Sequence, residues 1–239
     1  MNAWGHFKTI TSHKFLVMKY CFKVGLYKQG FLHDLSKYSP TEFMVGAKYY
    51  QGTRSPNNAE REATGVSTSW LHHKGRNKHH FEYWVDYGIG AEHVLAGMPM
   101  PRKYIAEMIM DRISASRTYH PETYTDASPL EYFLKGKDRL WFIHPDTSAQ
   151  IEYLLRMLAV KGEEKTLWYI KHVYLKNKGR FGGSGSTYVS PERGVPIKNE
   201  ERRWPGIVLR EQSDAGGLFY CVAFLPQFYC LCSLTKMKR

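Results

Sequence analysis

The chain has 239 residues and 43% of them are hydrophobic, a composition that can supply a buried core and excludes a globally disordered protein. A formal net charge of +12 and a pI near 9.4 favour an anionic partner, such as a phosphate ester, a nucleic acid or an anionic membrane surface. Of the four cysteines only Cys21 lies in the body of the chain, which excludes a disulfide framework and a cysteine-based zinc motif. The first residues show no signal-peptide pattern, so a reduced, cytoplasmic setting is predicted.

Hydrophobic periodicity predicts helices along most of the first 178 residues. Apolar side chains recur at helical spacing over residues 3–28 and, most regularly, over residues 102–117. Further helices are predicted over residues 41–50, from Ser67, from Ser128, over residues 145–160 and over residues 163–176. Residues 51–58 and 87–101 are predicted as connections, because Gly and Pro interrupt them. With no sustained alternating pattern, the predicted fold is an all-α domain that encloses its site between helices.

The character of the sequence changes after residue 178. Gly182-Gly183-Ser184-Gly185-Ser186 has the composition of a linker. Residues 217–234 are apolar and precede a basic end, as in a tail anchor, but Pro226-Gln227 interrupts the run. We therefore expect residues 1–178 to form one helical domain and residues 179–239 to be a poorly structured extension without function. A membrane partner is not favoured, and the scattered basic residues do not favour nucleic acid.

Histidine and aspartate recur in an order that suggests a shared site. His13 lies in the first predicted helix, His33-Asp34 follows it, and Asp111 lies in the middle of the helix over residues 102–117. Four histidines fall within nine residues, at positions 72, 73, 79 and 80. Buried imidazoles need partners, so this density is hard to explain by packing; the alternative is a His-rich surface tract that scavenges metal. Imidazole and carboxylate ligands suit iron, manganese and zinc.

This order, His, His-Asp, His, His, Asp, resembles the metal-binding pattern of the HD-domain superfamily, which implies a helical bundle of the HD-domain type. The phrases HDLSKYSP, GTRSPNN and HHKGRNKHHFEYW also resemble a small bacterial family known mainly as a domain of unknown function, over roughly residues 3–178. The resemblance to dinuclear HD proteins implies one or two divalent metals, with iron or manganese favoured over zinc. It implies these ligands: His13, His33, Asp34, His73, His80 and Asp111.

The residues leave open which histidine of each adjacent pair is the ligand. The unused partners, His72 and His79, are expected to orient ligands or touch substrate, as are Asn77, Arg76 and Arg112. Lys37 lies one helical turn after Asp34, and HD proteins often carry lysine there, so Lys37 and Asp34 are the predicted catalytic residues.

The resemblance and the basic charge together imply a function. A metal-activated water would hydrolyse a phosphate ester of an anionic, nucleotide-like small molecule. Two alternatives stay open from the sequence: a dinuclear iron oxygenase of the HD fold, and a non-catalytic protein in which metal only holds the helices together.

Overall fold

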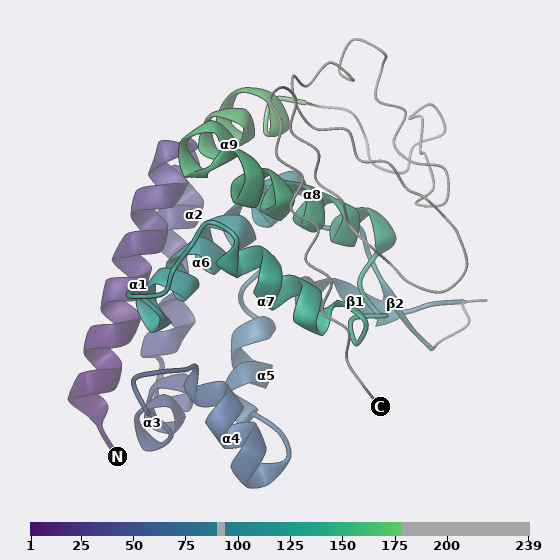
Figure 1. The fold of residues 1–239 in the computed structure, drawn as a ribbon. Helices are drawn as coiled ribbons and strands as arrows, with labels where there is room; N and C mark the ends of the chain where they lie inside the picture. Colours follow the sequence, from purple (N-terminus) through teal and green to yellow (C-terminus); the bar gives the residue numbers. More distant parts are fainter. Residues whose placement is uncertain (90–93, 178–239) are drawn as a thin grey trace, which may run out of the picture. The chain divides into compact units, whose positions relative to one another are not determined.

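The computed structural model describes residues 1–89 and 94–177. In these residues the all-α prediction is confirmed: helices form the body, accompanied by one small two-stranded sheet (Figure 1). The predicted linker and tail, residues 179–239, lie outside the described residues. No helix among the described residues is both long and apolar enough to cross a membrane.

The N-terminal half is a series of helices separated by sharp turns. Helix α1 (Ala3–Lys23) begins at Asn2, whose side chain accepts a hydrogen bond from the Gly5 backbone N–H at 2.8 Å. The elements that follow are α2 (Tyr27–Leu32), the 3-10 helix η1 (Leu35–Tyr38), α3 (Pro40–Lys48), α4 (Pro56–Thr64), α5 (Thr68–Lys74) and the 3-10 helix η2 (Phe81–Trp84).

The second half begins with the strands β1 (Val85–Tyr87) and β2 (Leu95–Gly97), which pair antiparallel with Asp86 opposite Ala96. The remaining elements are α6 (Arg102–Tyr119), α7 (Ser128–Lys137), α8 (Pro145–Lys161), α9 (Glu163–Tyr169) and the π-helix η3 (Ile170–Tyr174).

Three local features differ from the sequence prediction. The helix expected over residues 3–28 ends at Lys23, because Gly25 adopts a φ of +83° and turns the chain into α2. Helix α4 begins at Pro56, inside the expected loop, since proline fits the first helical position. The β1–β2 pair lies partly in the expected connection, and each strand is three residues long, too short for an alternating pattern to stand out.

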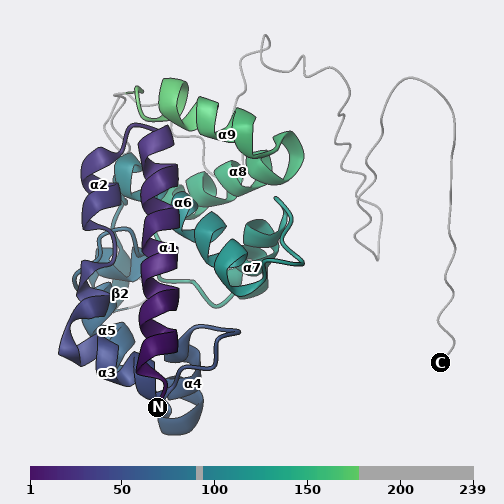
Figure 2. The ribbon, with the colours of Figure 1, turned by 90° about the vertical axis from the view of Figure 1, so that its left-hand side faces the viewer.

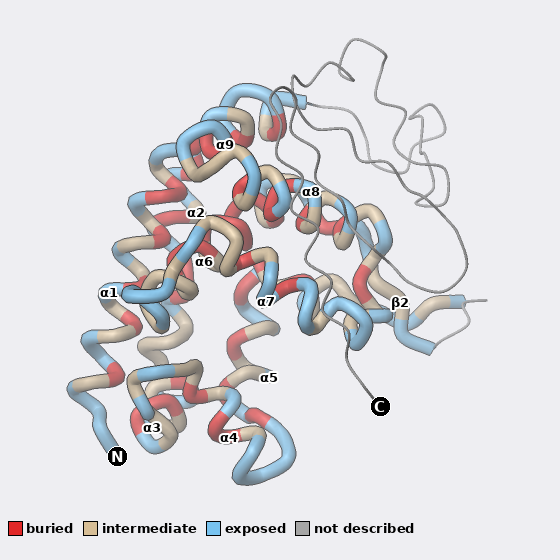
Figure 3. The backbone as a smooth tube through the Cα atoms, viewed as in Figure 1, coloured by how far each residue is buried: buried red, intermediate tan, exposed pale blue. Residues whose placement is uncertain are grey.

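Helix α6 is the centre of the core. It packs against α1 and α8, and Ile105, Ile109 and Ile113 on its apolar side are fully buried. Figure 2 shows α1 running lengthwise with α2 beside it and α6 behind. In Figure 3 buried positions recur along α1, α6 and α8. This packing fixes α1 against α6, and each of these two helices carries a candidate site residue.

The contact between α1 and α3 requires a residue without a side chain. A Cβ at Gly46 of α3 would overlap the imidazole of His6 on α1, whereas a Cβ at Gly136 of α7 meets nothing within 4 Å. We expect Gly46→Ala to lower the free energy of unfolding by about 1–3 kcal/mol through overpacking. Gly136→Ala, the matched control, should raise it by roughly 0.5–1 kcal/mol through helix propensity. Urea denaturation of both variants checks this, and equal effects would contradict the close packing at Gly46.

Candidate metal centre

Asp34 lies in a turn between α2 and η1 that has an uncommon backbone conformation. Its φ of 54° and ψ of 23° are left-handed, and no other non-glycine residue in the described ranges has a positive φ. Aspartate tolerates this region better than most residues, but it still costs of order 1 kcal/mol. The turn lets adjacent side chains converge, with His33 Nε2 3.3 Å from Asp34 Oδ2. Strain of this kind is concentrated at functional sites.

One group of donors joins α1, this turn and α6. On α1, His13 Nε2 lies 3.0 Å from Asp111 Oδ1 and 3.8 Å from Asp34 Oδ2. His33 Nε2 lies 3.7 Å from the same Asp111 oxygen. One donor atom from each of His13, His33, Asp34 and Asp111 falls within 4.8 Å of the others, so this group can hold a metal ion.

A second group joins the same turn to α5 and the loop that follows it. Asp34 Oδ1 lies 3.3 Å from His73 Nε2 and 3.4 Å from His79 Nε2, and His80 Nε2 lies 3.0 Å from His73 Nε2. These four residues can also hold a metal ion. His79, assigned an outer role from the sequence, therefore lies among the donors together with His80. The two oxygens of Asp34 face different groups, so this one carboxylate can donate a ligand oxygen to each of them.

Several of these donor atoms have no hydrogen bond in the fold. Nε2 of His13, His33 and His79 and Oδ1 of Asp34 are buried without a hydrogen-bond partner among the described residues. Leaving such a group unsatisfied costs about 1–3 kcal/mol. Ligands about 2.1 Å from a metal lie roughly 3.0–3.4 Å from one another, which is close to the separations here. The residues therefore fit a divalent cation.

Glu107 on α6 orients two of the imidazoles. Its Oε1 lies 3.0 Å from His33 Nδ1 and 3.1 Å from His79 Nδ1. A histidine that binds metal through Nε2 carries its proton on Nδ1 and donates it to such an acceptor. The same three residues could themselves surround an ion, but the Nδ1 contacts are those of hydrogen bonds from two rings to one carboxylate.

Glu42 on α3 orients the two adjacent histidines of α5 through their Nδ1 atoms in the same way. Oε1 of Glu42 lies 2.6 Å from His72 Nδ1, and Oε2 lies 2.8 Å from His73 Nδ1. The sequence analysis named neither glutamate. Glu107 stands four residues before Asp111, on the same face of a strongly predicted helix, and that spacing could have indicated it. Glu42 carries no comparable signal.

The electrostatics of the cluster follow from the burial of carboxylates beside imidazoles. Burial would raise the pKa of Asp34, but His33, Lys37 and His73 hold it well below its ordinary value. Burial opposes ionisation of Asp111 too, and His13 and His33 hold its pKa well below the usual range. Burial lowers the pKa of His13, and burial together with His79 and His73 lowers that of His80. Burial would lower the pKa of His33 and His79 too, but the carboxylates of Asp34, Asp111 and Glu107 instead raise the pKa of His33, and Asp34 and Glu107 raise that of His79. Metal binding through Nε2 requires neutral imidazoles, so these two rings would release their extra proton when an ion binds.

The other predicted residues lie around the two groups. Lys37 Nζ is 2.6 Å from Asp34 Oδ2, and its side chain is 27% exposed. His72, Arg76 and Asn77 line a cavity next to His73. The Arg112 guanidinium lies over the ring of Phe133 on α7, 5.5 Å from its centroid, and so packs between helices.

Helix α5, which carries His72 and His73, is held at its N-terminus by Glu60 of α4. The Glu60 carboxylate accepts hydrogen bonds from the hydroxyls of Ser67, Thr68 and Ser69 and from the backbone N–H of Thr68 at 3.0 Å. Burial would raise the pKa of Glu60, but these hydrogen bonds lower it to about 2. The bonds fix the start of α5 relative to α4.

We expect Glu60→Gln to lower the free energy of unfolding by about 3 kcal/mol at pH 7, the equivalent of the pKa shift. Because the folded-state pKa lies below the unfolded value of 4.5, this stability is complete above pH 4.5 and is lost as the pH falls towards 2. The difference between wild type and variant in urea denaturation should therefore shrink between pH 5 and pH 3. A difference that stays constant over this range would contradict the assignment.

Comparison with known families identifies the chain. The model of a family of unknown function, DUF5662, matches residues 2–157. The chain belongs to this family. The match spans every donor residue of both groups, from His13 to Asp111. Comparisons with curated proteins and with solved structures find no match.

Proposed function

We propose that the protein is a metal-dependent phosphohydrolase that acts on a phosphate ester, with a nucleotide-like small molecule as substrate. The observation that carries this proposal is the pair of donor groups that share Asp34, Oδ2 facing one group and Oδ1 the other. The order of the donors along the chain also resembles that of dinuclear HD proteins. Two metals that share one carboxylate are a recurrent arrangement in enzymes that hydrolyse phosphate esters.

The donor set suits iron, manganese or zinc, because it consists of imidazoles and carboxylates without a thiolate. When bound, a divalent metal lowers the pKa of a coordinated water towards 7 and so supplies a nucleophile at neutral pH. Asp111 and Lys37 are the accessible edge of the cluster, with side chains 16% and 27% exposed. We assign the approach of substrate to this edge.

Lys37 has two tasks in this proposal. Burial would lower the pKa of Lys37, but the adjacent carboxylate of Asp34 raises it, so the ammonium stays charged. Its contact with Asp34 Oδ2 holds that carboxylate in place. As a partly exposed cation beside the donors, it attracts and neutralises the phosphate of an entering substrate.

The test is phosphate release from a panel of nucleoside monophosphates and sugar phosphates. Protein stripped by chelation should be inactive, and protein reloaded with Fe²⁺, Mn²⁺ or Zn²⁺ should release phosphate. Lys37→Ala should reduce kcat/KM, whereas Lys28→Ala, at an exposed lysine of α2, should not. Oxygen consumption by the iron-loaded protein without phosphate release would favour an oxygenase instead. Stabilisation by metal with no turnover would favour a binding protein.

A further inference from the structure

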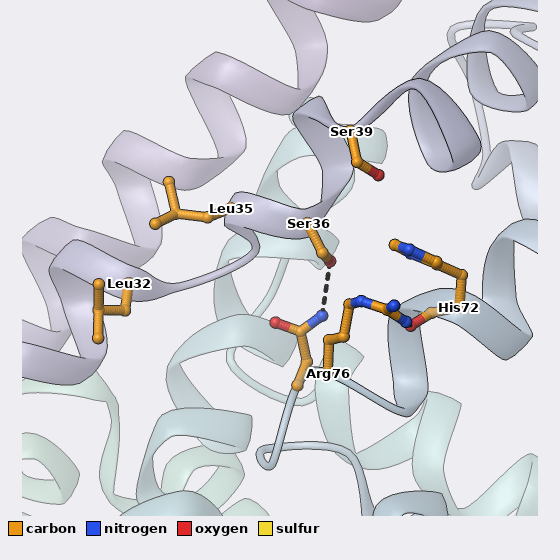
Figure 4. Close-up of a pocket in the computed structure, with 7 residues that line it drawn as sticks. Leu32, Leu35, Ser36, Ser39, His72 and Arg76 are labelled. Carbon is orange, nitrogen blue, oxygen red and sulfur yellow. Dashed lines mark hydrogen bonds between the residues drawn. The ribbon is translucent and has the colours of Figure 1, made fainter.

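A cavity of about 430 Å³ lies beside the cluster. It is lined by side chains of α2, η1 and α5, of Ser39 directly after η1, and of the loop that follows α5. Figure 4 shows Ser36 and Ser39 on one side of it and His72 and Arg76 on the other. The seven lining residues are Leu32, Leu35, Ser36, Ser39, His72, Arg76 and Asn77. The proposed chemistry uses none of them directly.

His73 separates this cavity from the two donor groups. Its Nε2 faces Asp34 and His80, whereas its Nδ1 lies 3.2 Å from Ser36 Oγ and 3.1 Å from Asn77 Nδ2. The Asn77 amide also donates to Ser36 Oγ at 2.8 Å, the bond drawn in Figure 4. A molecule in the cavity would therefore touch the residues that surround the Nδ1 side of His73.

The lining offers positive charge and a free hydroxyl. Arg76 forms no ion pair among the described residues, and its one hydrogen bond there is from Nη1 to the His72 carbonyl at 3.3 Å. The Ser39 hydroxyl is buried and has no hydrogen-bond partner in the described part of the chain. No carboxylate lines the cavity, and the nearby Glu42 is already bound to His72 and His73. Such a lining suits an anion.

One end of the cavity is apolar. Leu32 and Leu35 are 53% and 48% exposed, a high value for leucines that flank a cavity. A ligand that covers them removes that apolar surface from water, which favours binding. We propose that this cavity binds a small organic anion, with its carboxylate or phosphate at Arg76 and Ser39 and a short aliphatic part over Leu32 and Leu35.

The test is calorimetric titration of the metal-stripped full-length protein with hexanoate, hexyl phosphate, methyl phosphate and hexanol. We expect the two hexyl anions to bind saturably and more tightly than methyl phosphate, and hexanol to bind weakly. Arg76→Gln should weaken binding of the hexyl anions by roughly 10- to 100-fold, the usual effect of a lost charge-assisted contact. Arg139→Gln, at an exposed arginine outside the cavity, should leave binding unchanged.

The Lys37→Ala variant separates this cavity from the metal centre, because Lys37 is the partly exposed cation beside the donor groups. Binding kept in Lys37→Ala but weakened in Arg76→Gln and in Ser39→Ala supports the proposal. Binding lost in Lys37→Ala but kept in Arg76→Gln would place the anion at the donor groups and overturn it, as would the absence of saturable binding. Neither result depends on turnover, so the binding experiment tests the cavity independently of the proposed phosphohydrolase activity. The ratio of the affinities for hexanoate and hexyl phosphate then shows whether the cavity prefers a carboxylate or a phosphate.

Discussion

Replacing Asp34 by asparagine is expected to abolish metal binding in both groups and to reduce phosphate release by roughly 1,000-fold or more. The metal contributes several kcal/mol of transition-state stabilisation, and each 1.4 kcal/mol or so is tenfold in rate. Asparagine keeps the size of the side chain and tolerates a φ of 54°, so the turn between α2 and η1 should survive. It offers one ligand oxygen and no charge, whereas both carboxylate oxygens of Asp34 face donor groups.

Metal content by elemental analysis, with circular dichroism to confirm the fold, checks this expectation. Asp86→Asn is the matched control, because Asp86 lies on the exposed strand β1, away from the donors. This control should bind metal as the wild type does. An Asp34→Asn protein that is folded and retains both metals would show that Asp34 is not the shared ligand.

Glu107→Gln is expected to have the next largest effect. The substitution removes the charge that faces His33 Nδ1 and His79 Nδ1 while it keeps an acceptor oxygen and the volume of the side chain. Loss of a carboxylate that orients metal-binding histidines typically costs about 10- to 100-fold in metal affinity. Because Glu107 serves one histidine of each group, both metals should be bound more weakly.

Competition with a calibrated chelator measures this affinity. Glu131→Gln, at an exposed position in the first turn of α7, is the control and should leave the affinity unchanged. Glu107→Gln could instead lower the affinity for one metal only. That result would contradict the assignment of His33 and His79 to separate donor groups. An unchanged affinity for both would mean that Glu107 is merely a structural hydrogen-bond acceptor.

The helices were largely predictable because their apolar residues recur with a helical period. The buried face of α1 carries His6, Ile10, His13 and Val17 three or four residues apart. Phe7 and Phe15, which contribute to the apolar pattern of this segment, are exposed instead, so that pattern predicts the helix but not the direction of His13. The same face of α6 that carries Asp111 also carries the buried residues Glu107, Met108 and Ser114. Local periodicity therefore indicates which elements could bring donors together.

The details of the site depend on contacts between residues that are distant in the chain. Whether His79 or His80 faces Asp34 is decided by the loop after Gly75, where α5 ends and no periodic pattern applies. The contact of Glu42 with His72 and His73 requires α3 to pack on α5, thirty residues further on. The left-handed conformation of Asp34 likewise leaves no trace in the local sequence, since most residues with this φ are glycines.

The most direct test of the central claim is the number and position of metals bound by the full chain. Protein loaded anaerobically with Fe²⁺, or with Mn²⁺, should bind two ions per chain. Anomalous scattering from a crystal should place one among His13, His33, Asp34 and Asp111 and the other among Asp34, His73, His79 and His80. Stoichiometric loading with no peak beside Asp34, or no binding by a folded protein, would contradict the account.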